Sequence, residues 1–257
     1  MDYGVLSQLD VTTLLLCFVV ALVAGIVKGA VGFAMPLILV SGISSLTDPK
    51  LAIAAMLIPT VVSNIFQTFR QGVNPALAAA REYWRYLVVV CIFIFLSAQL
   101  VPFISSQVFY LILGIPVVFL SLVQLAGIQL SVAPENRKKA EWVLGVISGL
   151  LGGFAGTWGP TTVMYLLAIN TPKAKQMIVQ GVVYGAGSVT LISAHLQSGV
   201  MNKETAPFSL LLLPIAMLGM WYGFRIQDRL DQKLFRRLTL VVLVIAGLNL
   251  LRKGLTG

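Results

Sequence analysis

Long runs of apolar residues, separated by short polar segments, dominate the sequence. A helix that crosses the hydrocarbon core of a membrane needs about 20 residues at about 1.5 Å each, and lipid offers its backbone no hydrogen-bond partner. The longer runs therefore predict transmembrane α-helices. We delimit ten runs, at residues 11–27, 31–46, 51–69, 84–101, 108–130, 142–155, 160–169, 174–196, 207–224 and 238–251.

The runs fall into two groups of five, separated by the polar segment 131–141. A shift of 124 positions aligns glycine and proline residues of the two groups, which are residues that shape the backbone. The aligned residues are Gly25, Gly29, Gly32 and Pro36 with Gly149, Gly153, Gly156 and Pro160. We interpret this as an internal repeat. The predicted organisation is a first repeat at 1–130, a cytoplasmic linker at 131–141 and a second repeat at 142–257.

Composition and charge strengthen the membrane interpretation and add an orientation. Of the 257 residues, 58% are hydrophobic and only 11% are charged, whereas a soluble domain carries about 25% charged residues. Nucleic-acid binding is therefore not expected, and the net charge of +9 is first a topology signal. When the loop after the third run is placed in the cytoplasm, 14 Lys and Arg residues lie on that side, against Lys50, Lys203, Arg252 and Lys253 on the other.

This orientation places both termini outside and gives the two halves opposite directions across the membrane. Such inverted repeats are typical of secondary transporters. The first ten residues contain no Lys or Arg, so we expect the first run to be a retained helix, not a cleaved signal. The predicted location is the bacterial inner (cytoplasmic) membrane, with both termini on the periplasmic side.

The second run of each half is short and follows a glycine-rich break, at residues 28–35 and 152–159. Irregular backbone at membrane depth is tolerated only inside the protein or against a water-filled cavity, so we expect the breaks to line a cavity. The N-terminal ends of the short helices would present free N–H groups that suit an anion. Alternatively, the glycines let helices pack closely, and Gly25 and Gly29 fit that interpretation.

The third run of each half carries polar residues along one helix face, and such a face must point into the bundle. These faces hold Thr60, Asn64, Gln67 and Gln71 in the first half and Gln176, Gln180, Tyr184, Ser188 and His195 in the second. They could contact a substrate or hydrogen-bond between helices. His195, the only histidine, could couple protons or be a satisfied bundle residue.

The nine carboxylates all fall outside the interior of the apolar runs. This disfavours a cationic substrate, which usually needs a buried acid, and it disfavours an intramembrane enzyme. Lys28 at the first break and Arg70 after the third run could each neutralise an anion or anchor a helix end at the interface. Phe33 and Trp158 could wall the cavity or simply pack. No metal site or cofactor is predicted.

Several motifs resemble one family. Residues 25–33 with Pro36 and Leu37 are similar to the first glycine-rich signature of the TauE/SafE sulfite and organosulfonate exporters, and residues 149–160 are similar to its second copy. The tail, from residue 218 through Gly247, is similar to the last helical hairpin of the family. The chain departs from the glycine-richer form of the first signature at Lys28, Ala30 and Ala34.

The resemblance implies export of sulfite, sulfoacetate or a related C2 sulfonate from the cytoplasm, and about eight transmembrane helices. The expected fold is an all-α polytopic membrane protein with 8–10 transmembrane or half-crossing helices. The expected function is a secondary transporter working by alternating access, with an inverted-repeat exporter of another small metabolite or organic anion as the alternative. The expected partners are a small anion and the lipid bilayer, and a homodimer is compatible with the sequence.

The candidate substrate-binding residues come from the two breaks and the two polar faces. They are Lys28, Gly29, Gly32, Phe33, Met35, Asn64, Gln67, Arg70, Gly153, Gly156, Thr157, Trp158, Thr161, Gln180 and Tyr184, with His195 for proton coupling.

Overall fold

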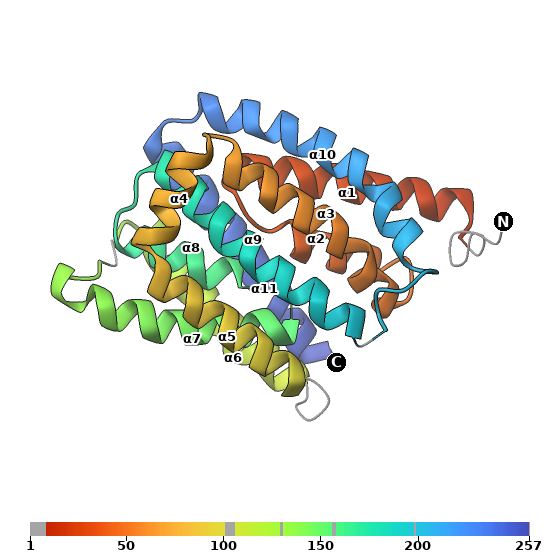
Figure 1. Cartoon of the computed structure of the whole chain (residues 1–257), viewed down its shortest axis with the longest axis horizontal. Helices are drawn as coiled ribbons and strands as arrows, with labels where there is room; N and C mark the ends of the chain where they lie inside the picture. Colours follow the sequence, from red (N-terminus) through yellow and green to blue (C-terminus); the bar gives the residue numbers. More distant parts are fainter. Residues whose placement is uncertain (1–8, 101–105, 129–130, 156–157, 198, 257) are drawn as a thin grey trace.

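A computed structural model of the chain describes residues 9–100, 106–128, 131–155, 158–197 and 199–256 (Figure 1). Within these ranges the chain forms α-helices and one 3-10 turn, and no β-strand. The helices are α1 (Val11–Val31), α2 (Met35–Ile43), α3 (Pro49–Phe69), α4 (Val73–Glu82), α5 (Trp84–Leu100), α6 (Ser106–Leu125), α7 (Arg137–Ala155), α8 (Gly159–Ala168), α9 (Lys173–Gln197), α10 (Ala206–Arg229) and α11 (Gln232–Thr256). Each predicted apolar run corresponds to one helix, and α4 is an additional helix.

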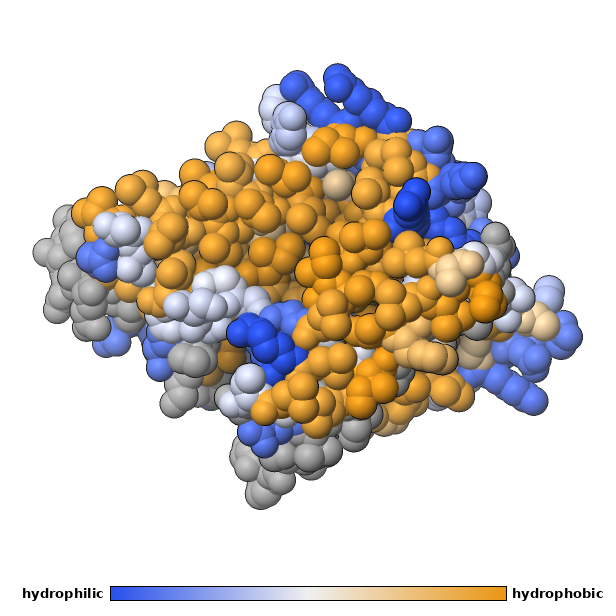
Figure 2. All heavy atoms as spheres, turned by 180° about the vertical axis from the view of Figure 1, so that it is seen from behind, coloured by the Kyte–Doolittle hydropathy of each residue, from blue (hydrophilic) through white to orange (hydrophobic). Residues whose placement is uncertain are grey.

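Five of the described helices are long and apolar enough to cross a membrane. These candidate spans are Val11–Val31, Leu51–Phe69, Lys173–Gln197, Ala206–Arg229 and Gln232–Thr256, with a shorter apolar segment at Trp84–Ser97. Large apolar side chains such as Leu15, Phe95 and Ile245 are exposed on the outside of the bundle, and hydrophobic residues cover most of the face in Figure 2. The chain is an all-α, polytopic integral membrane protein.

The helices pack in pairs, and each pair joins one helix of the first half to one helix of the second half. α1 packs on α10, and α5 packs on α7; α3 packs on α9 and α6 on α11. In Figure 1, α1 and α10 lie along one edge of the molecule, α5 and α7 lie toward the opposite edge, and α3 and α9 run between them. If α7 is the counterpart of α1 and α10 that of α5, the first two contacts are equivalent, as expected for two related halves.

Glycines allow the closest of these contacts. A side chain at Gly25 or Gly29 of α1 would collide with the backbone of α10 at Ala216 and Met220, and one at Gly149 of α7 would meet the backbone of α5 at Val90. The helix-packing interpretation of Gly25 and Gly29 is therefore the one that the structure supports.

The breaks are shorter than predicted because both preceding helices continue through their glycines. α1 ends at Val31, and the Gly32 N–H still donates to the Lys28 carbonyl at 2.7 Å. The chain then turns sharply at Gly32 (φ 87°) and Ala34 (φ 74°) before α2 begins. In the second half α7 continues to Ala155 and α8 begins at Gly159. Glycine inside a membrane helix keeps its backbone bonds, so glycine alone does not mark where the helix stops.

The segment predicted as a linker, 131–141, is partly helical. It contains a 3-10 turn, Pro134–Asn136, and α7 begins at Arg137, five residues before the predicted apolar run. Lys, Arg and Glu are good helix formers, so the helix extends beyond the apolar residues that hydropathy detects. This extension carries Glu141 into the helix and sets the position of its side chain.

Candidate functional site

The site is centred on Lys28, a buried cation in the last turn of α1. Lys28 as a whole is only 1% exposed. The ammonium Nζ donates to Asn64 Oδ1 at 2.6 Å, to Gln67 Oε1 at 2.9 Å and, at 3.4 Å, to the Gly32 carbonyl. The Tyr184 ring lies 5.5 Å from Nζ. All of these partners are neutral, so no carboxylate of the described residues neutralises the charge.

The two amides on α3 are held in a fixed orientation between Lys28 and α9. Asn64 Nδ2 donates to the Tyr184 carbonyl at 3.0 Å, and Gln67 Nε2 donates to the Met177 carbonyl at 2.9 Å. Their oxygens consequently point to the ammonium. The interhelical interpretation of the polar faces thus holds for Asn64 and Gln67, which also position the cation.

Next to Lys28 lies a cavity formed by both helix breaks. It contains about 390 Å³ of empty space, counting the part that opens to solvent. The lining residues are Lys28, Phe33, Ala34, Pro36, Leu37, Asn64, Trp158, Gly159, Pro160 and Tyr184. The first turns of α2 and α8 thus border one space, each with a proline at the start, where a missing N–H is harmless.

Contacts within the second half shape one wall of the cavity, and Phe33 from the first half completes it. Tyr184 Oη donates to the Gly159 carbonyl at 3.0 Å, and the rings of Trp158 and Tyr184 meet edge to face with centroids 6.4 Å apart. Phe33 packs beside Gly159. The walls are therefore largely apolar and aromatic, and the polar side chains among them are those of Lys28, Asn64 and Tyr184.

Gln180 supports the first break from α9. When its amide is oriented to suit its neighbours, Nε2 donates to the carbonyls of Val31 (3.3 Å) and Gly32 (3.2 Å), and Oε1 accepts from Gln176 Nε2 (3.2 Å). Gly32 is needed here for two reasons. Its φ is positive, and a side chain would overlap Gln180 and Met177.

Several of the other predicted site residues do not line the cavity. Gly29 is inside α1, against α10. Met35 is fully buried and accepts a contact from Ser63 Oγ at 3.4 Å, and Thr161 is buried in α8. Gly153 is buried inside α7, while Gly156 and Thr157 lie outside the described residues.

Arg70 and His195 are also apart from Lys28. Arg70 donates to Gln227 Oε1 at 2.7 Å, pairs with Asp228 Oδ2 at 2.6 Å and stacks on Phe224. It ties α3 to α10, as an anchor does. His195 is in the last turn of α9, eleven residues beyond Tyr184, which corresponds to about 16 Å along a helix.

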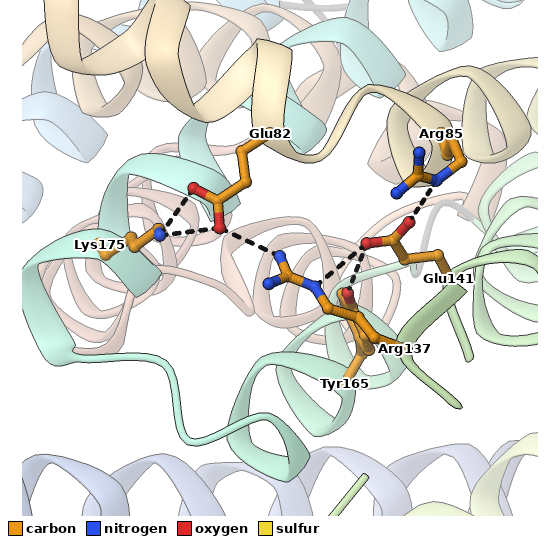
Figure 3. Close-up of polar contacts among 6 residues, drawn as sticks. All are labelled: Glu82, Arg85, Arg137, Glu141, Tyr165 and Lys175. Carbon is orange, nitrogen blue, oxygen red and sulfur yellow. Dashed lines mark hydrogen bonds and ion pairs between the residues drawn. The ribbon is translucent and has the colours of Figure 1, made fainter. Parts of the chain in front are cut away.

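A second buried charge, Glu141, was missed by the sequence analysis (Figure 3). Glu141 is 1% exposed, so it is buried in the bundle although it lies outside the predicted apolar runs. Arg85 Nε contacts Oε2 at 2.8 Å; Arg137 Nε and Tyr165 Oη contact Oε1 at 3.3 and 3.2 Å. Both oxygens are neutralised by arginines, so Glu141 offers no free negative charge to a cationic substrate.

Glu141 and its partners Arg85, Arg137 and Tyr165 form a polar cluster, the Glu141 cluster. Further contacts extend this cluster to the surface and toward the cavity. Glu82 accepts from Arg137 Nη2 at 3.1 Å and from Lys175 Nζ at 2.7 Å. Tyr165 stacks on Tyr86 with ring centroids 5.0 Å apart. Tyr86 Oη then donates to Thr162 Oγ1 at 3.0 Å, and Thr162 donates to the Trp158 carbonyl at 2.9 Å. These contacts link five helices, α4, α5, α7, α8 and α9, around one polar cluster.

The sequence did contain a signal for this cluster. Arg137 and Glu141 have the i,i+4 spacing of an ion pair on one helix face, directly before an apolar run. The partners Glu82 and Arg85 are more than fifty residues away along the chain, and no local pattern connects them to α7.

Comparison with known proteins adds one finding. Neither the curated proteins nor the solved structures include a significant match to the chain. The sequence model of the family described as "Sulfite exporter TauE/SafE" matches residues 17–250, which covers the cavity, both breaks and the Glu141 cluster. The chain therefore belongs to the TauE/SafE sulfite exporter family of membrane transporters.

Proposed function

We propose that this chain is a secondary transporter that exports a small sulfur-containing anion, either sulfite or a C2 sulfonate such as sulfoacetate. The observation that carries the proposal is the Lys28 ammonium, buried beside the cavity with only neutral acceptors. A buried charge is costly without an opposite charge. An anion in the cavity would supply that charge while it is bound, and its release would empty the site again.

The geometry suggests how the anion would be held. The Gly32 carbonyl, at 3.4 Å, is the most distant of the three acceptors of Nζ, so an anionic oxygen could replace it while Asn64 and Gln67 keep the ammonium in place. The first N–H groups of α2 and α8 border the same space and favour negative charge. The aromatic walls from Phe33, Trp158 and Tyr184 would enclose the remainder of the substrate.

The transport cycle that we propose is alternating access between two inverted repeats. The exchanged pairing of α1 with α10 and α5 with α7 fits two related repeats, and it implies that each moving unit would combine helices of both repeats. The charge distribution supports an inner-membrane protein with both termini in the periplasm. A negative interior drives an anion outward by about 2.3 kcal/mol per charge for each 100 mV.

The second candidate function is export of a different small organic anion, such as a carboxylate metabolite. The apolar walls of the cavity favour it, because they would suit a substrate with a hydrocarbon part. The N–H groups at the helix ends would bind a carboxylate as readily as a sulfonate, so transport of the two kinds of anion must be compared directly.

The experiment is transport by the purified chain in proteoliposomes. Uptake of labelled sulfite, sulfoacetate, isethionate, taurine and a carboxylate isostere would be followed for the wild type, Lys28→Gln and Lys28→Arg. We expect Lys28→Gln to reduce transport about 100-fold or more, as expected for loss of a desolvated charge contact, and Lys28→Arg to retain part of it. Lys203→Gln, a change of the same type at an exposed residue, is the matched control.

Two results would overturn the proposal. Preference for the carboxylate isostere would favour the second candidate. Normal transport by a well-expressed Lys28→Gln variant would show that the buried cation serves only the packing of α1.

A further inference from the structure

A second pocket lies at the far end of α8 from the Lys28 cavity, and the two share no lining residue. It holds about 940 Å³ of empty space, counting the part open to solvent. It lies where α8 ends and where α9 and α11 begin. Its lining residues are Leu167, Asn170, Thr171, Pro172, Gln232, Lys233 and Arg236.

The side-chain amide oxygens around this pocket are already used. Asn170 Oδ1 accepts from Arg236 Nη1 at 3.1 Å, and Gln124 Oε1 accepts from Arg236 Nη2 at 3.0 Å. Gln232 Oε1 caps the start of α9 by accepting from the Lys173 N–H at 2.7 Å. The parts of these amides that remain are donors, namely the side-chain NH₂ groups of Asn170 and Gln232.

The charges in the pocket have the same sign. Lys233 and Arg236 are both cations, and no ion pair joins either of them to a carboxylate of the described residues. The neighbouring Asp231 is engaged in capping α11, where its Oδ1 accepts from the Leu234 N–H at 2.7 Å. Arg236 is instead held by two neutral amides, which fix its position and leave its charge uncompensated.

A buried hydroxyl adds an independent observation. Thr171 is 4% exposed and lines the pocket, yet its Oγ1 has no hydrogen-bond partner among the described residues. A buried polar atom without a partner costs free energy, so native proteins normally provide one. A bound oxyanion in this pocket would be such a partner.

We infer that this pocket binds an oxyanion, held by Lys233, Arg236, the amides of Asn170 and Gln232 and the Thr171 hydroxyl. Two sources carry that chemistry, the phosphate of an anionic lipid headgroup and a free anion in solution. A basic pocket between membrane helices suits a headgroup, and exposed apolar side chains follow along α11 at Leu234, Val241 and Ile245. The site does not depend on the Lys28 cavity, so either can fail without the other.

The test compares two double variants of the purified chain. In Lys233→Gln/Arg236→Gln both pocket cations are removed, and in Arg229→Gln/Arg237→Gln two exposed cations outside the lining are removed with the same change in net charge. Binding of phosphatidylglycerol and of phosphatidylcholine to the delipidated protein is measured by native mass spectrometry. Binding of inorganic phosphate is measured by equilibrium dialysis.

We expect the pocket variant to bind the oxyanion about tenfold or more weakly, as fits the loss of two charge-assisted contacts, and the control variant to be unchanged. Loss confined to phosphatidylglycerol assigns the site to a lipid phosphate, and the same loss with inorganic phosphate assigns it to a free anion. Equal loss in both double variants, or no saturable binding of either probe by the wild type, would overturn the inference.

Two single variants protect the test against misfolding. Lys233 is exposed, so Lys233→Gln should fold normally and still weaken binding. Thr171→Val removes only the hydroxyl, and we expect it to weaken binding about fivefold, the weight of one hydrogen bond, without lowering the unfolding temperature. Unchanged binding in both single variants would contradict the assigned ligands.

Discussion

Among the described residues, two buried side chains, Lys28 and Glu141, carry charges of opposite sign, and their surroundings differ. Glu141 has a cation on each carboxylate oxygen and a tyrosine hydroxyl in addition. Lys28 is equally buried, at 1% exposure, but its ammonium meets two amide oxygens and one carbonyl. One charge is neutralised by the protein itself, while the other is only solvated by neutral dipoles.

This difference indicates different roles. An ion pair that is complete within the protein fixes helices relative to one another, and removing one member exposes the cost of burying the rest. A cation without a counter-charge contributes little to the fold, but under the proposed function it would attract an anion to the adjoining cavity. The Glu141 cluster is therefore expected to govern stability, and the Lys28 site is expected to govern ligand binding.

The largest expected effect on stability comes from Glu141→Gln. The change leaves Arg85 and Arg137 without their shared carboxylate, and we expect a loss of about 2–3 kcal/mol in the free energy of unfolding. The value is below that of a fully buried pair because these arginine side chains are 30% and 36% exposed and can regain water. Unfolding in mixed micelles, followed by tryptophan fluorescence, measures it.

Glu204→Gln is the matched control for Glu141→Gln, since Glu204 is exposed and belongs to no ion pair of the described residues. It should change the free energy of unfolding by less than about 0.5 kcal/mol. If both variants lose the same small amount, the Glu141 cluster does not hold the helices together and the comparison with Lys28 fails.

Lys28→Met should give the opposite pattern, a loss of ligand response without a large loss of stability. Without anion, the free energy of unfolding should stay within about 1 kcal/mol of the wild type. The variant loses the hydrogen bonds to Asn64 and Gln67, but it also no longer has to bury a charged group. At an anion concentration 100 times the dissociation constant, the wild type should gain about 2.7 kcal/mol and the variant nothing.

The same unfolding assay, repeated with and without sulfite, checks this response. An equal gain for wild type and Lys28→Met would mean that the anion binds elsewhere. The pocket at Lys233 and Arg236 is then the place to look, and combining Lys28→Met with Lys233→Gln separates the two.

The contrast between the two charges also explains what the sequence could predict. Apolar runs and the Gly and Pro spacing predicted the helices and both breaks, and five candidate residues, Lys28, Phe33, Asn64, Trp158 and Tyr184, do line the cavity. These signals are local, since each depends on residues within one or two helix turns.

Features that depend on contacts between distant segments escaped prediction. Glu141 is buried because α7 starts at Arg137, and its partner Arg85 lies 56 residues earlier. Arg70 pairs with Asp228, 158 residues away. The orientation of Asn64, with its oxygen on Lys28 and its NH₂ on α9, is likewise set by the packing of α1 and α9 on α3.

Ala34→Gly tests the backbone that positions the Lys28 cavity. Ala34 has a φ of 74°, which is unfavourable for a residue with a side chain, whereas every described residue of the Glu141 cluster has ordinary backbone. Glycine should therefore stabilise the protein by about 0.5–1 kcal/mol. Ala30→Gly, inside α1, is the control and should destabilise it by a similar amount. Two changes of the same sign would contradict a strained break.

The smallest expected effect concerns Glu82, at the exposed end of the Glu141 cluster. Burial alone would raise the pKa of the Glu82 carboxyl, but Lys175 and Arg137 outweigh it and hold the pKa below its ordinary value of 4.5. The stabilisation is thus complete above pH 4.5 and disappears as the pH falls through the lowered pKa. Because Glu82 is 37% exposed and screened by solvent, Glu82→Gln should cost at most about 0.5–1 kcal/mol at pH 7. Unfolding measured between pH 7 and pH 3 should show the two proteins converging at the acid end. A difference that persists unchanged at pH 3 would mean that Glu82 acts through packing and not through its charge.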